Sequence, residues 1–116
     1  MIELSKSQKK IARQLIDVGL QRECKTFTEK IARFIGSPKW ETENPHELYL
    51  QLYKKVVSFD KHIARRYNGL TGSHYFITVL GLFMDGVLTT DDIASFDIEI
   101  QERLIKLSQS YELNHD

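Results

Sequence analysis

The sequence predicts a small all-α domain, and three observations support this. Apolar residues recur in steps of three and four along most of the chain, which is the period of one helix face. Residues that begin and end helices lie at the edges of these segments. A length of 116 residues, with 41% hydrophobic and 28% charged residues, suits one domain over residues 1–116. We expect an up-down-up-down four-helix bundle, with helices over about 7–35, 45–68, 72–86 and 90–112.

The first helix is expected over residues 7–35. Thr26 and Glu29 match a capping box, which can begin a new helix, and Gly19 is a weak helix former. Because the apolar period continues across both places, we predict one continuous helix that ends at Gly36; a break near residues 24–26 is the alternative. The apolar face of this helix consists of Ile16, Leu20, Cys24, Phe27, Ile31 and Phe34.

The second helix, expected over 45–68, has the clearest start signal. Asn44 suits the N-cap, because its side-chain oxygen can accept a bond from a free backbone N–H, and Pro45 loses nothing at the first helical position. Asn68 and Gly69 supply the end of the helix. Its apolar stripe is expected at Tyr49, Leu52, Tyr53, Val56, Phe59, Ile63 and Tyr67.

The last two helices are expected over 72–86 and 90–112. Residues 73–85 are apolar nearly all round, which is typical of a helix in the middle of a core. A strand is rejected for this segment because no other segment could pair with it. Thr89 and Asp92 resemble a capping box at the start of the fourth helix. The apolar stripe of that helix is expected at Ile93, Phe96, Ile100, Leu104, Leu107 and Tyr111.

Composition excludes several classes of protein. The single cysteine, Cys24, can form neither a disulfide framework nor a multi-thiolate zinc site. The first residues lack the apolar centre of a signal peptide. The longest apolar run, residues 75–84, is shorter than the roughly 20 residues that a membrane span needs. We therefore expect a cytoplasmic protein that has no membrane partner.

Motifs for catalysis and metal binding are weak, and we expect no catalytic residue, cofactor or metal site. Glu43 and His46 form a Glu-x-x-His pair, but this pair straddles a helix cap, so its side chains would not share a face. Neither a phosphate-binding glycine loop nor a His-Glu-x-x-His motif is present. One enzymatic alternative, supported only by proximity in sequence, is a site built from Asp60, His62, Arg65 and Tyr67.

Charge divides the chain into two parts. Residues 1–66 carry 14 Lys/Arg and 8 Asp/Glu, whereas residues 67–116 carry 2 and 8. These parts either attract each other in the fold or leave a basic surface for an anionic partner. On the second helix, the spacing of seven and four puts several cations on one line, with others beside it. The candidate surface for an anionic partner consists of Lys54, Lys55, Lys61, His62, Arg65 and Arg66.

These patterns favour a non-enzymatic helical module for protein interaction or self-association, for instance as a homodimer. Trp40 lies in the loop after the first helix; it either closes one end of the bundle or anchors an interface. Ile98, Ile105 and Leu82 are apolar positions in excess of the expected stripes, and Ile98 and Ile105 join Trp40 as candidate interface anchors. The alternative function is binding of nucleic acid or a phosphate-bearing ligand by the basic residues of the second helix. A pI of about 6.9 weakens the nucleic-acid form of this alternative.

Overall fold

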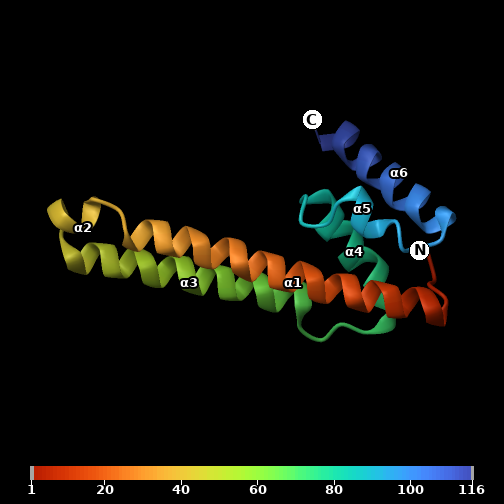
Figure 1. Ribbon diagram of the computed structural model, residues 1–116, viewed down its shortest axis with the longest axis horizontal. Coiled ribbons are helices and arrows are strands. Elements are labelled where there is room, and N and C mark those ends of the chain that lie inside the picture. The colour runs from red at the N-terminus through yellow and green to blue at the C-terminus, as the bar shows by residue number, and fades with distance from the viewer. Residues whose placement is uncertain (1, 116) are drawn as a thin grey trace. The chain divides into compact units, whose positions relative to one another are not determined.

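The computed structural model describes residues 2–115, and side chains as far as Tyr111; Met1 and Asp116 lie outside the described residues. Every regular element in that range is helical, which confirms the all-α prediction. No helix in the described part of the chain is long and apolar enough to cross a membrane. The elements are α1 (Lys6–Ile35), α2 (Lys39–Thr42), α3 (Pro45–Tyr67), η1 (Gly72–His74), α4 (Tyr75–Met84), α5 (Thr90–Ile93) and α6 (Ile98–His115) (Figure 1).

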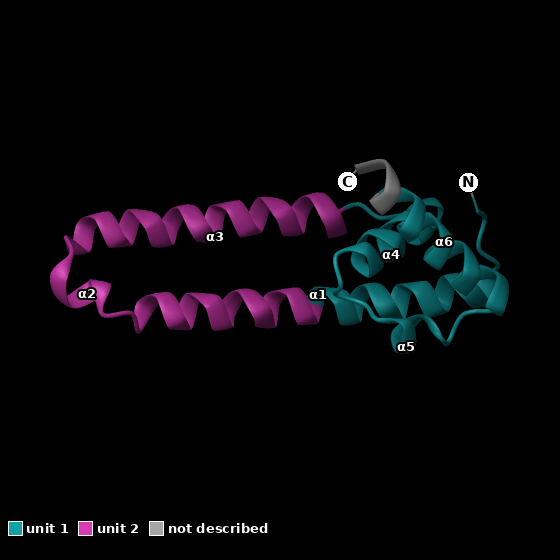
Figure 2. Ribbon diagram, turned by 90° about the horizontal axis from the view of Figure 1, so that it is seen from above, with its two compact units in different colours: residues 1–20, 69–116 teal, residues 21–68 magenta. Residues whose placement is uncertain are grey.

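The chain divides into two compact units, and α1 contributes to both (Figure 2). Residues 21–68 form one unit, which we call the hairpin: the second half of α1, the short α2, and α3. Residues 1–20 and 69–116 form the other, which we call the terminal unit. Two such units are compatible with one domain, and both the single domain and the up-down-up-down order stay predictions.

The first helix is continuous, and the alternative of a break near residues 24–26 is wrong. α1 runs for 30 residues through the capping-box pattern. The hydroxyl of Thr28 donates to the carbonyl oxygen of Lys25 at 3.0 Å, so a polar side chain in this region is satisfied within the helix. Cys24 and Phe27 are both partly buried, as the uninterrupted apolar period predicts.

The start of α3 follows its sequence signal. The side-chain oxygen of Asn44 accepts the backbone N–H of His46 at 2.8 Å and that of Glu47 at 3.4 Å, and Pro45 occupies the first helical position. Gly69, just beyond the C-cap, has a φ of 69°, a conformation that favours glycine. The predicted helix over 45–68 is therefore confirmed.

The third predicted helix, over 72–86, consists of the short η1 and of α4. Thr71 and His74 form a capping box in which the ring nitrogen Nδ1 of His74 takes the place of a carboxylate and accepts a hydrogen bond from the backbone N–H of Thr71 at 3.3 Å. Gly86, with a φ of 75°, follows the end of α4. Buried side chains of α4 contribute to the core of the terminal unit: Phe76, Val79, Leu80 and Leu82.

The fourth predicted helix, over 90–112, is wrong as one element because it is interrupted between α5 and α6. The capping box of Thr89 and Asp92 is present but begins only the single turn of α5. The side-chain oxygen of Gln8 accepts the backbone N–H of Asp97 at 3.2 Å, and thereby satisfies a group at the start of α6. The apolar stripe nevertheless stays buried on both sides of the interruption: Ile93, Phe96, Ile100 and Leu104.

A close helix contact in the terminal unit explains why Gly19 is tolerated inside α1. A Cβ atom at Gly19 would lie 2.7 Å from the Cδ1 atom of Leu82. Leu82 is fully buried, so our expectation that it is a surplus apolar position is wrong. The absence of a side chain at Gly19 leaves the space that this leucine fills.

We predict opposite effects of Gly19→Ala in two backgrounds. In the wild-type protein the new methyl group meets Leu82, and the overpacking outweighs the helix preference of alanine, so the free energy of unfolding falls by about 1 kcal/mol. With Leu82→Ala the space is empty, and Gly19→Ala raises the free energy of unfolding by about 1 kcal/mol. Urea denaturation of the four proteins measures this cycle, and the same sign in both backgrounds would contradict it.

Candidate functional site

The end of the hairpin at α2 is closed by Trp40. Its indole N–H donates to the carbonyl oxygen of Phe34 at 2.9 Å. The two aromatic rings pack edge to face, with centroids 5.7 Å apart. Trp40 is partly buried by these contacts within the hairpin, whereas its role as an interface anchor stays a prediction.

A carboxylate lies in the middle of the contact between α1 and α3. One oxygen of Glu23 is 2.9 Å from Nε2 of His62 and 2.8 Å from Nη1 of Arg66. Its second oxygen accepts the hydroxyl of Tyr67 at 2.6 Å. The side chain of Glu23 is only 11% exposed, so these three donors replace the water that the carboxylate has lost. We call these four residues the Glu23 cluster.

The Glu23 cluster perturbs the tyrosine most clearly. Burial raises the pKa of Tyr67 well above its ordinary value, and the hydrogen bond to the Glu23 carboxylate raises this pKa further. A tyrosinate there would be desolvated and would face a carboxylate. Tyr67 therefore keeps its proton over the whole neutral range and donates a hydrogen bond to Glu23. Its role in the cluster is to stabilise the contact between the two helices.

Sequence reasoning missed Glu23, although a signal was present. Glu23 falls between Leu20 and Phe27 at helical spacing, so it lies in the apolar face of α1. An acid in such a face needs a partner, and the basic residues of α3 are the available ones. His62 and Arg66 are both bonded to Glu23, and their place on a surface for an anionic partner stays a prediction.

The other four expected residues of that surface remain at the outside of the hairpin. Lys54, Lys61 and Arg65 are exposed and follow one another along α3 at the predicted spacing; we call them the basic line. The ammonium group of Lys55 lies 5.1 Å from the centroid of the Phe34 ring, within the range of a cation–π contact.

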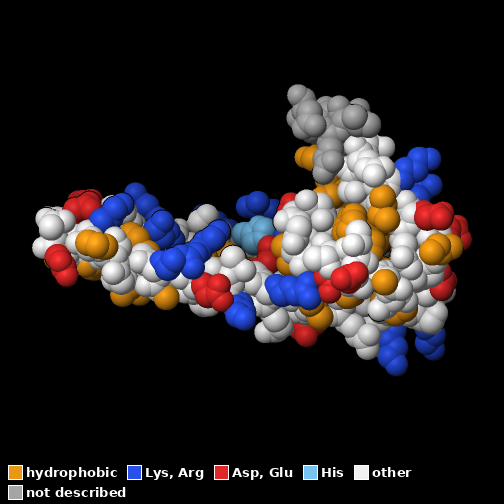
Figure 3. All heavy atoms as spheres, turned by 45° about the horizontal axis from the view of Figure 1, so that its top comes forward, with side chains coloured by type: hydrophobic (Ala, Val, Ile, Leu, Met, Phe, Trp, Pro, Cys, Tyr) orange, Lys and Arg blue, Asp and Glu red, His pale blue; other side chains and the backbone are white. Residues whose placement is uncertain are grey.

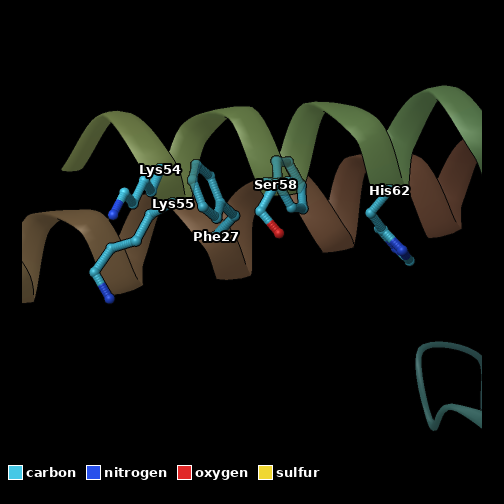
Figure 4. Close-up of a pocket in the computed structure, with 6 residues that line it drawn as sticks. Phe27, Lys54, Lys55, Ser58 and His62 are labelled. Carbon is cyan, nitrogen blue, oxygen red and sulfur yellow. The ribbon is translucent and has the colours of Figure 1, made fainter. Parts of the chain in front are cut away.

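A pocket of about 480 Å³ opens beside the basic line (Figure 4). Phe27 from α1 and Phe59 from α3 stack in this region with parallel rings, whose centroids are 4.1 Å apart. Lys54 and Lys55 lie to one side of Phe27, and His62 lies to the other. The residues that line the pocket are Phe27, Lys54, Lys55, Ser58, Phe59 and His62.

Another face of α3 carries apolar side chains that are about half exposed. Tyr49, Tyr53 and Val56 are 55%, 59% and 45% exposed, so these three members of the expected apolar face of the second helix are not buried. Their spacing of four and three places them on one line, which we call the apolar stripe. Figure 3 shows hydrophobic side chains along the lower edge of the hairpin near α2, with Lys and Arg side chains above them.

The remaining expected residues are distributed over the chain. Ile98 of α6 is 69% exposed, and Ile105 is partly buried. Of the residues in the enzymatic alternative, His62 and Tyr67 meet at Glu23, whereas Asp60 and Arg65 are exposed. Among the described residues, no three His, Cys, Asp or Glu side chains are grouped so as to hold a metal ion. Comparisons with family models, with curated proteins and with solved structures find no match.

We predict that Tyr67→Phe destabilises the protein in a pH-dependent way. Because the pKa of Tyr67 is raised on folding, its contribution is complete below the unfolded value of about 10 and is lost as pH rises above that value. Urea denaturation should give a difference from wild type of about 1–2 kcal/mol at pH 8 and a smaller one at pH 11. Tyr49→Phe is the matched control for loss of one hydroxyl, and a Tyr67→Phe difference that grows with pH would contradict the prediction.

Proposed function

We propose that the protein is a non-enzymatic helical module that self-associates through the apolar stripe of α3. The exposure of Tyr49, Tyr53 and Val56 on one line is the observation that supports it most directly. Aromatic side chains are enriched among residues that dominate binding energy in interfaces. Grouped exposed apolar residues on a small protein are characteristic of interaction surfaces, whereas isolated ones are ordinary.

The packing of the hairpin adds to this proposal. Two helices can bury only the faces that meet, and among the hydrophobic residues of the hairpin only Leu48 is fully buried. A second copy that docks on the apolar stripe would remove the exposed rings from water, at a gain of roughly 25 cal/mol per Å² of apolar surface. Such a contact is isologous, because the same stripe is supplied by both copies.

Further features belong to the same proposal. The interface anchors Ile98 and Ile105 of α6 are spaced by two helical turns, so they offer a protein partner a separate apolar surface on the terminal unit. We further propose that the module is a single domain with the up-down-up-down bundle topology and that it is located in the cytoplasm. Glu23 of α1 contacts Arg66 of α3, and the later Phe27 contacts the earlier Phe59, so the two helices run antiparallel, which supports the proposed topology.

A charge placed on the apolar stripe tests self-association. We predict that the wild-type protein forms a dimer in light scattering after gel filtration, and that Tyr53→Glu shifts it to the monomer, because a carboxylate at the centre of an apolar contact is desolvated without a partner. Gln51→Glu is the matched control: it adds the same charge at an exposed position of α3 outside the stripe, and should leave the dimer intact. A wild-type protein that stays monomeric at millimolar concentration contradicts the proposal.

A second candidate function is binding of an anionic partner by the basic side of α3. Lys54, Lys61 and Arg65 are exposed on one line, and the hairpin carries 10 Lys/Arg against 6 Asp/Glu. Such a surface attracts phosphate groups by charge, with an affinity that falls as salt rises. A phosphate-bearing ligand is favoured over duplex nucleic acid, because the cations lie beside a pocket on the hairpin.

A further inference from the structure

We infer that the pocket between Lys54 and His62 binds an aromatic organic phosphate, a molecule that joins a flat ring to a phosphate group as a nucleotide does. The inference rests on the second candidate function, binding of an anionic partner by α3. It names the pocket as the binding site and an aromatic organic phosphate as the class of ligand. It is independent of self-association, since Tyr49, Tyr53 and Val56 do not line the pocket.

The cations of the pocket are suited to a phosphate group. Lys54 and Lys55 are consecutive residues that both line the pocket. The contact of the Lys55 ammonium group with the Phe34 ring restrains that side chain, which lowers the entropy lost when a ligand is bound. Ser58 adds a hydroxyl group on the same wall. A phosphate here meets two point charges and a neutral donor.

The phenylalanine rings of the pocket favour a flat aromatic ring as the part of the ligand that is attached to the phosphate. Phe27 and Phe59 are parallel and stacked on each other, so a space that touches both must lie beside the stack, against the ring edges. Ring edges carry the positive part of the aromatic quadrupole, and they pack well against the face of another ring. A flat ligand ring placed across these edges therefore gains edge-to-face contacts with both phenylalanines.

The size and lining of the pocket favour an occupant larger than a bare anion. A volume of about 480 Å³ falls within the range of roughly 300–1,000 Å³ for small-molecule sites. A phosphate group alone would leave most of the aromatic wall in contact with water. An organic body attached to the phosphate fills this space and uses the apolar lining.

The carboxylate of the Glu23 cluster does not oppose an anionic ligand. Glu23 contacts the pocket residue His62, but its charge is compensated by Arg66 at 2.8 Å. The same contact fixes the His62 ring at the wall of the pocket. The Glu23 cluster thus holds one side of the site in place without presenting a free negative charge to it.

Calorimetry and NMR with adenosine 5′-monophosphate as the probe test this inference on the full chain. We expect the probe to bind more tightly than inorganic phosphate or adenosine, because each of these lacks one half of the recognised chemistry. Binding should shift the ring-proton resonances of Phe27 and Phe59. Equal affinity for the probe and for inorganic phosphate, or ring resonances that do not move, would overturn the inference.

Two matched double variants separate the pocket from the rest of the basic side. Lys54→Ala with Lys55→Ala should weaken binding of the probe by about tenfold or more, through loss of both charges at the phosphate. Lys61→Ala with Arg65→Ala removes the same charge from α3 outside the pocket lining, and should weaken binding less than about threefold. Circular dichroism checks that both variants fold.

The outcomes distinguish this inference from the second candidate function. If both double variants weaken binding equally, the anion is held by the basic side as a whole, and the pocket inference is wrong while the candidate function stands. If neither adenosine 5′-monophosphate nor a short single-stranded oligonucleotide binds at low salt, both are wrong. Binding of the oligonucleotide that depends on Lys61 and Arg65 but not on Lys54 and Lys55 also overturns the pocket inference.

Discussion

The hairpin depends on how a nearly buried carboxylate is satisfied. Glu23 can remain charged between two helices only if donors reach it, and these come from three positions in the last turns of α3: His62, Arg66 and Tyr67. A shift of α3 along α1 would remove these donors and leave the charge desolvated, which costs several kcal/mol. The Glu23 cluster therefore selects one register for helices whose apolar contacts would tolerate several.

That register has consequences along the rest of the interface. Glu23 and Phe27 are one turn apart on α1, and Phe59 and His62 are one turn apart on α3, so the ring stack and the carboxylate occupy adjacent turns of one contact. With the rotation of α3 fixed in this way, its remaining positions divide between two exposed sides. The apolar stripe lies on one side, and the basic line with the pocket lies on another, so a single helix presents two chemically different surfaces.

The sequence predicts this fold well where the determining interactions are local. Asn44 accepts hydrogen bonds from N–H groups two and three residues away, so the start of α3 can be predicted from the sequence. The interruption before α6 cannot be predicted in this way, because Gln8 is 89 residues distant from the Asp97 N–H that it binds. Periodicity also identified Tyr53 as part of an apolar face, but it carries no information on whether another helix covers that face. The Glu23 cluster was missed for a different reason. Glu23 stands out in the sequence as an acid within an apolar face, but its basic partners on α3 were not identified.

The Glu23 cluster also bears on whether a binding role or a catalytic one is better supported. Nε2 of His62 is engaged with Glu23, an arrangement that orients the ring and leaves Nδ1 as the ring nitrogen available to a ligand. Burial and the hydrogen bond to the same carboxylate raise the pKa of Tyr67, so its hydroxyl stays protonated and is a poor nucleophile or base. Asp60 and Arg65 are exposed, whereas His62 and Tyr67 meet at Glu23, so the contacts of the cluster account for only two of the four groups of the enzymatic alternative. The groups that meet at Glu23 satisfy one another, so the proposed binding role rests on the pocket lining instead: two lysines, a hydroxyl, two phenylalanine rings and the His62 ring.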